Sequence, residues 1–231
     1  MLYKLWFHRL WINDLDPSIA CLWTSVIRHP EDIAQRILDF TPGVDAFFEF
    51  KHAIRQLCFV PDDENALIDY GFKTLALIKM SRHGAGQEVQ GGIRQQGRHT
   101  VNYRWHLESL VHNLWQWHRK LAYFQPREGR CDCQDFTRLI EDESCRAVLY
   151  LDPPYFKPSR SYYRYPFSEK DHFRLAAALK ACSHKWVLSY DDVPEIRDLY
   201  SWAKIRPIKT TYTLNSELAE GNELIITGSR P

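Results

Sequence analysis

Four consecutive residues, Asp152-Pro153-Pro154-Tyr155, join an acid, two prolines and an aromatic ring directly after the apolar run 147–151. Proline fixes its own φ and restricts the residue before it, so the groups around it are held in place. The Asp152 carboxylate and the Pro153 carbonyl can therefore accept the two hydrogens of a planar amine. A rigid stop after a strand would also explain two prolines, but it would require neither the acid nor the ring.

The exocyclic amine of a nucleobase is one planar amine that would fit this arrangement. Its lone pair is delocalised into the ring, so it is a poor nucleophile. Two acceptors favour a pyramidal nitrogen and free the lone pair to attack a sulfonium methyl group. Tyr155 offers an aromatic face for a base that has left the duplex, as enzymes that modify bases generally require. Catalysis would then rest on positioning and electrostatics, and no metal is needed.

The elements that must position these residues form a predicted open α/β sheet. The continuous apolar run Val148–Leu151 is typical of a strand buried on both faces. Further strands are predicted at Trp186–Tyr190, ending in two acids, and at Glu223–Thr227. Ser168 to Asp171 offers a capping box that opens a helix. Strand–helix–strand alternation of this kind places ligands at the carboxyl edge of the strands.

The first half of the chain is predicted to be mainly helical. A short strand at 10–17 ends in acids, and helices follow up to His29-Pro30 and from Glu31 to about Phe40. Helical spacing continues at 47–79 and again at 101–121. Between them, 80–103 has five glycines and no apolar periodicity, which predicts a flexible loop.

The motif at 152–155 matches the amino-methyltransferase signature [DNS]-PP-[YFW], and the chain resembles DNA adenine N6-methyltransferases of the Dam type. In that family an acid at a strand end contacts the adenine of the cofactor, and Asp135 with Phe136 packing nearby resembles this element. A second acid binds the ribose hydroxyls, and the match at 12–17 gives Asp14 this role. Similarity covers about 8–231.

The resemblance implies a Rossmann-like, S-adenosylmethionine-dependent methyltransferase sheet with a helical target-recognition insertion. Residues 1–46 and 130–231 would form the α/β core, and 47–129 the insertion. The implied cofactor is S-adenosyl-L-methionine. The implied partner is double-stranded DNA, methylated at adenine in a short site such as GATC.

Two clusters of basic residues are candidate DNA contacts. The stretch 79–104 has five Lys or Arg residues against one acid, and Arg pairs well with guanine edges and Gln with adenine edges. The second cluster follows the motif directly and interleaves basic residues with tyrosines, which suits phosphate contacts and the gap left by an extruded base. The candidates are Arg82, Arg94, Gln95, Gln96, Arg98, Lys157, Arg160, Tyr163 and Arg164.

One family element is missing from the sequence. The family begins with a strand and an F-x-G-x-G loop, in which only glycine lets the backbone approach the cofactor closely. Here the first glycine is Gly43, already beyond the acid at Asp14, and Gly221 and Gly228 make no such turn near the other end. We therefore expect an N-terminally truncated fold, and neighbouring strands left without a partner unless another segment is recruited.

Composition excludes several other classes of protein. The chain of 231 residues suits one domain with an insertion, and its net charge of +1 creates no global field for a polyanion. No apolar run approaches the roughly 18 residues of a membrane span. Six scattered cysteines without a CxxC pair are typical of reduced thiols, so we expect a cytoplasmic protein. No metal site is expected, because the histidines at 106, 112 and 118 share no helical face.

Two alternatives remain open at this point. Within the enzyme class, an RNA adenine or protein glutamine methyltransferase would use the same motif, because it reads only a planar amine. From another class, a non-catalytic remnant could bind DNA without methylating it. An in-frame F-x-G-x-G encoded upstream of Met1 would favour a misassigned start of an active enzyme. The recognised site, the oligomeric state and the host, phage or restriction context stay undetermined.

The missing glycine loop gives a first testable expectation. The intact 231-residue chain should bind S-adenosylmethionine weakly or not at all, because nothing in it supplies the close backbone approach to the methionine end of the cofactor. Calorimetric titration of the cofactor into the protein measures this directly. Tight binding would contradict the expectation.

Overall fold

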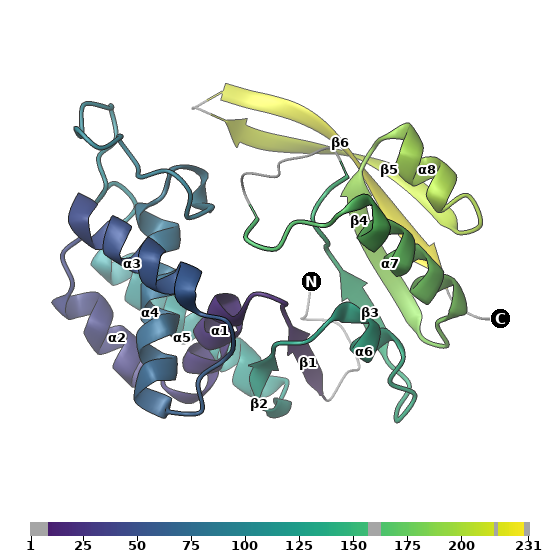
Figure 1. Cartoon of the computed structure of the whole chain (residues 1–231), viewed down its shortest axis with the longest axis horizontal. Helices are drawn as coiled ribbons and strands as arrows, with labels where there is room; N and C mark the ends of the chain where they lie inside the picture. Colours follow the sequence, from purple (N-terminus) through teal and green to yellow (C-terminus); the bar gives the residue numbers. More distant parts are fainter. Residues whose placement is uncertain (1–8, 157–162, 215–216, 229–231) are drawn as a thin grey trace. The chain divides into compact units, whose positions relative to one another are not determined.

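The computed structural model describes residues 9–156, 163–214 and 217–228, and the chain forms two compact units, 1–134 and 135–231. Each unit has its own hydrophobic core. In Figure 1 the first unit contains a group of helices and two short strands, and the second contains the larger sheet. The mixed α/β class expected from the sequence is confirmed.

Most helices of the first unit begin and end close to the predicted places, but the helical stretch predicted at 47–79 is two helices with a break at 57–63. The α-helices of this unit are α1 (Pro17–Arg28), α2 (Pro30–Asp39), α3 (Val44–Gln56), α4 (Glu64–Met80) and α5 (Leu107–Tyr123). The start of α5 lies six residues after the predicted 101, because 101–104 forms turns that bury Val101. Helices α1 and α4 pack closely at Gly71, where an added Cβ would lie 2.5 Å from the Ser25 Oγ atom. A bulkier residue there would force the two helices apart.

A two-stranded parallel sheet completes the first unit. Strand β1 (Leu10–Asn13) pairs with β2 (Pro126–Asp132), and the pairing continues past β1 because the Asp14 N–H donates to the Asp132 carbonyl at 3.1 Å. Among the described residues, β2 is the one strand that pairs with β1.

The second unit is built on a four-stranded sheet in the order β3-β4-β6-β5. Its strands are β3 (Val148–Leu151), β4 (Lys185–Asp191), β5 (Lys204–Leu214) and β6 (Glu217–Gly228). Strand β3 runs parallel to β4, while β6 is antiparallel to both β4 and β5. Helices α6 (Phe136–Ile140), α7 (Glu169–Ala181) and α8 (Pro194–Leu199) belong to the same unit. Neither α8 nor β5 was predicted.

Two sequence expectations meet different outcomes in this unit. The capping box is confirmed, since the Ser168 and Asp171 side chains each accept a hydrogen bond from the other's backbone N–H at the start of α7. The prediction that β3 is buried on both faces is wrong. Val148 is 43% exposed and Tyr150 is 60% exposed, because β3 lies at an edge of the sheet and only its other face meets the core.

The compact units also divide the chain differently from the family-based scheme. Residues 17–39, which the sequence placed in the α/β core, pack with the helices of the insertion through side chains such as Leu22 and Ile37. The assignment of 1–46 and 130–231 to one methyltransferase core, with 47–129 as the insertion, stays a prediction.

Candidate functional site

The register of β3 and β4 places Asp152 next to a hydroxyl donor. Leu151 of β3 lies opposite Leu188 of β4. The next residues along the two strands, Asp152 and Ser189, therefore lie side by side. The buried Ser189 hydroxyl donates to the Asp152 Oδ1 atom at 2.7 Å. The Asp152 side chain is nevertheless exposed. One carboxylate oxygen is thus fixed by the strand, and the other can accept a hydrogen bond from a ligand.

Two further hydrogen bonds hold the rest of the Asp152–Tyr155 segment. The Tyr155 hydroxyl donates to the Glu223 Oε1 atom of β6 at 2.9 Å. The next backbone N–H, that of Phe156, donates to the Asp191 Oδ1 atom at the end of β4, also at 2.9 Å. Burial, together with the hydrogen bond to Glu223 and its negative charge, raises the pKa of Tyr155 well above its ordinary value. Tyr155 therefore stays a neutral phenol across the physiological range.

Aromatic rings from α7 and β4 support this segment. The Phe156 ring lies 5.0 Å from the His172 ring, between centroids, and His172 Nδ1 is 2.6 Å from the Tyr190 hydroxyl oxygen. Burial lowers the pKa of His172, so the ring is neutral at pH 7. Tyr190 in turn lies 6.4 Å from the Tyr155 ring. The rings packed against the motif are thus apolar or neutral, as a platform for an aromatic base requires, whereas the acids Asp191 and Glu223 bond to the Phe156 N–H and the Tyr155 hydroxyl.

Asp135 caps α6 and is tied to α7. Its Oδ1 atom accepts the Thr137 backbone N–H at 3.1 Å, and both carboxylate oxygens lie 3.0 Å from the Arg174 guanidinium. Desolvation raises the pKa of Asp135, but the hydrogen bonds from Thr137 and Arg174 outweigh it, so that pKa is lowered overall. The Arg174 guanidinium also lies 5.0 Å from the centre of the Phe136 ring. Asp135 and Phe136 therefore form one fixed group at the start of α6.

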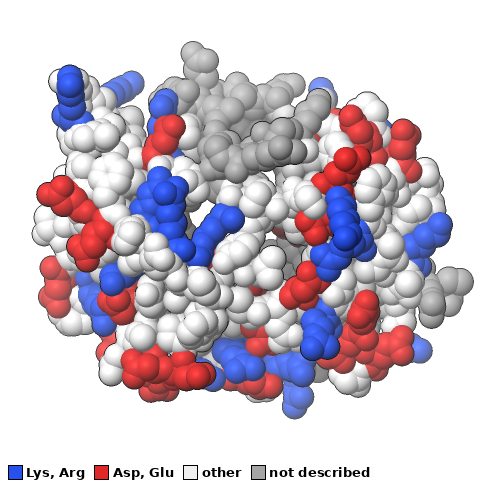
Figure 2. Space-filling view, viewed as in Figure 1, with Lys and Arg blue, Asp and Glu red and all other residues white. Residues whose placement is uncertain are grey.

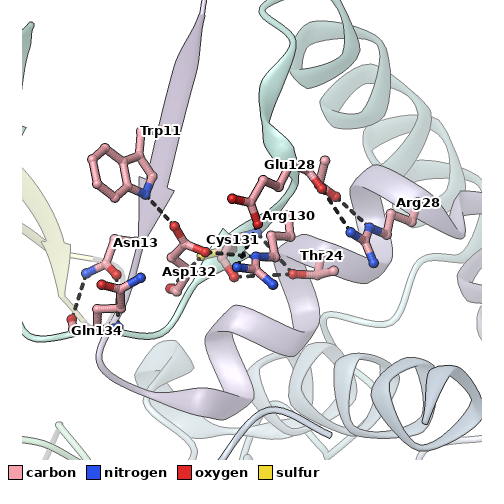
Figure 3. A network of polar contacts seen from close by, with 10 residues as sticks. Trp11, Asn13, Thr24, Arg28, Glu128, Arg130, Cys131, Asp132 and Gln134 are labelled. Atoms are coloured by element: carbon pink, nitrogen blue, oxygen red, sulfur yellow. Dashed lines mark hydrogen bonds and ion pairs between the residues drawn. The ribbon is translucent and has the colours of Figure 1, made fainter. Parts of the chain in front are cut away.

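Asp14 directly follows β1, and Figure 3 shows a network of polar contacts among the residues of β1 and β2. The Asn13 side chain donates to the Gln134 carbonyl at 2.9 Å and accepts its N–H at 3.0 Å. The Trp11 indole donates to the buried Asp132 carboxylate at 2.6 Å. These contacts fix the ends of both strands, so the position of Asp14 is set by the sheet.

Among the described residues, the Asp14 carboxylate accepts a single hydrogen bond, from the Asp16 backbone N–H at 2.8 Å. Desolvation by burial, with a smaller effect of the Asp16 charge, raises the pKa of Asp14 to about 6. The sheet therefore holds a carboxylate in surroundings that solvate it poorly. A hydrogen bond from a ligand hydroxyl would stabilise the charged form of such a carboxylate.

The predicted loop at 80–103 is closed by its own hydrogen bonds. The Gln95 amide donates to the Gln90 carbonyl at 2.9 Å and to Gly92, and its oxygen accepts the Val101 N–H at 2.6 Å. Gln95 itself has a left-handed φ of 51°. The Gln95 side chain would have to break these three hydrogen bonds to contact a base. The structure therefore favours a role for Gln95 in stabilising the loop conformation.

The other predicted DNA contacts differ in their surroundings. Arg94, Gln96 and Arg98 are exposed on the loop, and Arg82 lies 3.7 Å from the Glu88 carboxylate. Figure 2 shows Lys and Arg side chains at the upper left, the region in which Figure 1 draws this loop. The structure thus leaves three of the predicted readers pointing to solvent.

The second basic cluster is described only in part. Lys157 and Arg160 lie outside the described residues. Burial and the charges of Asp152 and Asp191 raise the pKa of Tyr163. The Arg164 guanidinium lies 5.2 Å from the centre of the Tyr165 ring.

The structure brings the predicted residues together in two groups. Asp152 to Tyr155, Asp135, Phe136, Tyr163 and Arg164 belong to the second unit, while Asp14 and the loop residues belong to the first. Sequence reasoning missed Ser189, Asp191 and Glu223, although it predicted the strands that carry them. A polar residue inside or at the end of an otherwise apolar strand was the signal that could have revealed them.

The described part of the chain contains neither a membrane-spanning helix nor a cluster of metal ligands. No helix in the described part of the chain is long and apolar enough to cross a membrane. Within the same residues, no group of three or more His, Cys, Asp or Glu side chains is arranged to hold a metal ion.

An acid and a proline pair thus follow a parallel strand of an α/β sheet, with aromatic side chains packed beside them. The model of the D12 class N6 adenine-specific DNA methyltransferases matches residues 2–214, and the chain belongs to this family. No curated protein matches it. The family methylates adenine in DNA, so the RNA adenine and protein glutamine alternatives gain no support.

The burial of Asp14 leads to a prediction about stability and pH. Its folded-state pKa of about 6 lies above the ordinary 3.8, so the folded protein binds more protons between these values and the free energy of unfolding falls as pH rises through this window. Asp14→Asn keeps the acceptor for Asp16 and removes the charge. We expect this variant to be more stable at pH 7 by about 1–3 kcal/mol, with a smaller fall between pH 4 and 6.

Urea unfolding at a series of pH values measures this difference. Asp62→Asn, on an exposed residue, is the matched control and should leave the pH profile unchanged. An Asp14→Asn profile that parallels that of the unmodified protein would show that Asp14 is solvated in the folded state.

Proposed function

We propose that Asp152, Pro153, Pro154 and Tyr155 carry methyl transfer to the N6 amine of an adenine extruded from duplex DNA. The observation that carries the proposal is the Asp152 carboxylate, exposed at the carboxyl end of β3 with one oxygen held by Ser189. A carboxylate fixed in this way presents its other oxygen to an amine at low reorganisation cost.

In the proposed reaction the Asp152 carboxylate accepts one N6 hydrogen and the Pro153 carbonyl accepts the other. The base stacks on Tyr155, whose ring is tied to β6 through its hydroxyl. S-adenosylmethionine supplies an electrophilic methyl group on a sulfonium sulfur. As the N–C bond forms, the S–CH3 bond would break and leave a neutral thioether. The methylated amine would then be acidic, and the Asp152 carboxylate would take its proton. The chain thus contributes position and charge, which is what this chemistry needs.

Each unit, taken by itself, carries residues that suit one part of the cofactor's adenosine. Asp14 would accept the ribose hydroxyls, because its carboxylate is partly buried and accepts a hydrogen bond from the Asp16 N–H alone among the described residues. Asp135 and Phe136 would hold the adenine ring and its amine, since they form one fixed group. None of the described glycines lies in a turn from a strand into a helix that could cradle the methionine part.

The exposed loop residues are proposed contacts to duplex DNA. Arg94, Gln96 and Arg98 would reach base edges, while Arg82, Lys157, Arg160, Tyr163 and Arg164 would contact the backbone or the space left by the extruded base. Support comes from the exposure of the first three and from the internal bonds that brace the loop carrying them. A braced loop positions its side chains at less entropic cost than a free one.

A comparison of three substrates tests the proposed reaction. Radiolabelled methyl transfer is measured at high cofactor concentration to duplex DNA carrying GATC, to an RNA hairpin and to a glutamine peptide. We expect transfer to DNA alone, and at least a 100-fold loss in Asp152→Ala, which removes both the acceptor and the proton site. Transfer to RNA or protein instead would contradict the proposal, and DNA binding without any transfer would indicate a non-catalytic remnant.

The loop assignment has its own test. Arg94→Ala combined with Arg98→Ala should reduce discrimination between related DNA sites by roughly 1–3 kcal/mol per lost base contact. Gel-shift titrations on matched and mismatched duplexes at two salt concentrations measure the effect. Arg119→Ala, on an exposed arginine of α5, serves as a charge control. If only the general, salt-sensitive affinity falls, these arginines contact phosphates.

A further inference from the structure

The Tyr155 hydroxyl has a partner that the proposed reaction does not use. Stacking of a base requires only the face of the ring, and the signature at this position admits Phe and Trp as well as Tyr. The hydroxyl nevertheless donates to the Glu223 carboxylate at 2.9 Å, and both side chains are partly buried. A hydrogen bond to an ionised acceptor is shorter and stronger than one between neutral groups.

Glu223 is held more rigidly than the segment it contacts. Strand β6 is hydrogen-bonded on both sides, with Glu223 opposite Asp191 of β4 and opposite Ile208 of β5. Tyr155, by contrast, lies in a non-helical, non-strand segment after β3. The hydrogen bond from Tyr155 to Glu223 therefore connects the loop to a central strand and restricts the motion of the ring.

We propose that Glu223 is a positioning residue that sets the plane of the Tyr155 ring, on which the extruded adenine stacks. This inference rests on the proposed function. Without the tie, the ring can move between rotamers, and the base would lose a defined stacking surface. Asp191 also restricts this segment, because its carboxylate accepts a hydrogen bond from the Phe156 backbone N–H at 2.9 Å. Tyr190 limits the ring from the core side, with 6.4 Å between centroids.

The test uses the full chain and a GATC duplex in which 2-aminopurine replaces the target adenine. Fluorescence reports extrusion and restacking of the base without any methyl donor. Glu223→Ala and Tyr155→Phe should each weaken formation of the restacked state by about 3- to 10-fold, since each removes one charge-assisted hydrogen bond. Glu223→Gln keeps an acceptor and should retain most of the signal.

The double variant separates positioning from general damage. If the two residues act through one bond, Tyr155→Phe combined with Glu223→Ala should be no worse than either alone. Asn222→Ala, on the exposed neighbour in β6, should change nothing, and urea midpoints check that all variants are folded. Effects that multiply, or a Glu223→Ala variant equal to the unmodified protein, would overturn the inference.

Failure of the proposed function has a different signature. It would appear as no fluorescence change in the unmodified chain on any duplex, and it would remove the basis for the role of Glu223 as well. A normal signal in the unmodified chain that is insensitive to Glu223→Ala and Tyr155→Phe would overturn the positioning role alone.

Discussion

The site depends above all on the register of β4 between β3 and β6. Parallel pairing of Leu151 with Leu188 brings Asp152 beside Ser189, and antiparallel pairing of Asp191 with Glu223 brings both acids to the end of the sheet where the motif begins. A slip of one residue would turn each side chain to the other face. The apolar core under β4, with Leu188 and Tyr190 fully buried, makes such a slip costly.

The two acids proposed to bind the cofactor differ in how their surroundings shift the pKa of the carboxylate. Asp135 is stabilised in its charged form by Thr137 and Arg174, and its pKa is lowered. Asp14 is desolvated with little compensation, and its pKa is raised to about 6. The first arrangement adds to the stability of α6 and α7. The desolvation of Asp14 costs stability in the free protein. A hydroxyl that donated to its carboxylate would offset this cost.

How far the sequence predicts the site depends on whether the signal is local. The capping box at Ser168 and the motif at Asp152 lie within four residues, and both were predicted correctly in their structural context. Glu223 lies 68 residues from Tyr155, and only the antiparallel return of β6 joins them. Gln95 was predicted to read a base because its residue type can do so, but the fold uses its amide to close the loop.

The hydrogen bonds that hold the motif all come from the second unit. Asp152, Tyr155 and Phe156 are tied to Ser189, Glu223 and Asp191, and none of these bonds involves the helices of the first unit or a cofactor. The residues that order the proposed amine site are therefore different from those proposed to hold the methyl donor. A glycine loop would affect the methyl-donor site directly and the amine site only indirectly. A protein that binds S-adenosylmethionine weakly can thus still present an ordered surface to an extruded adenine.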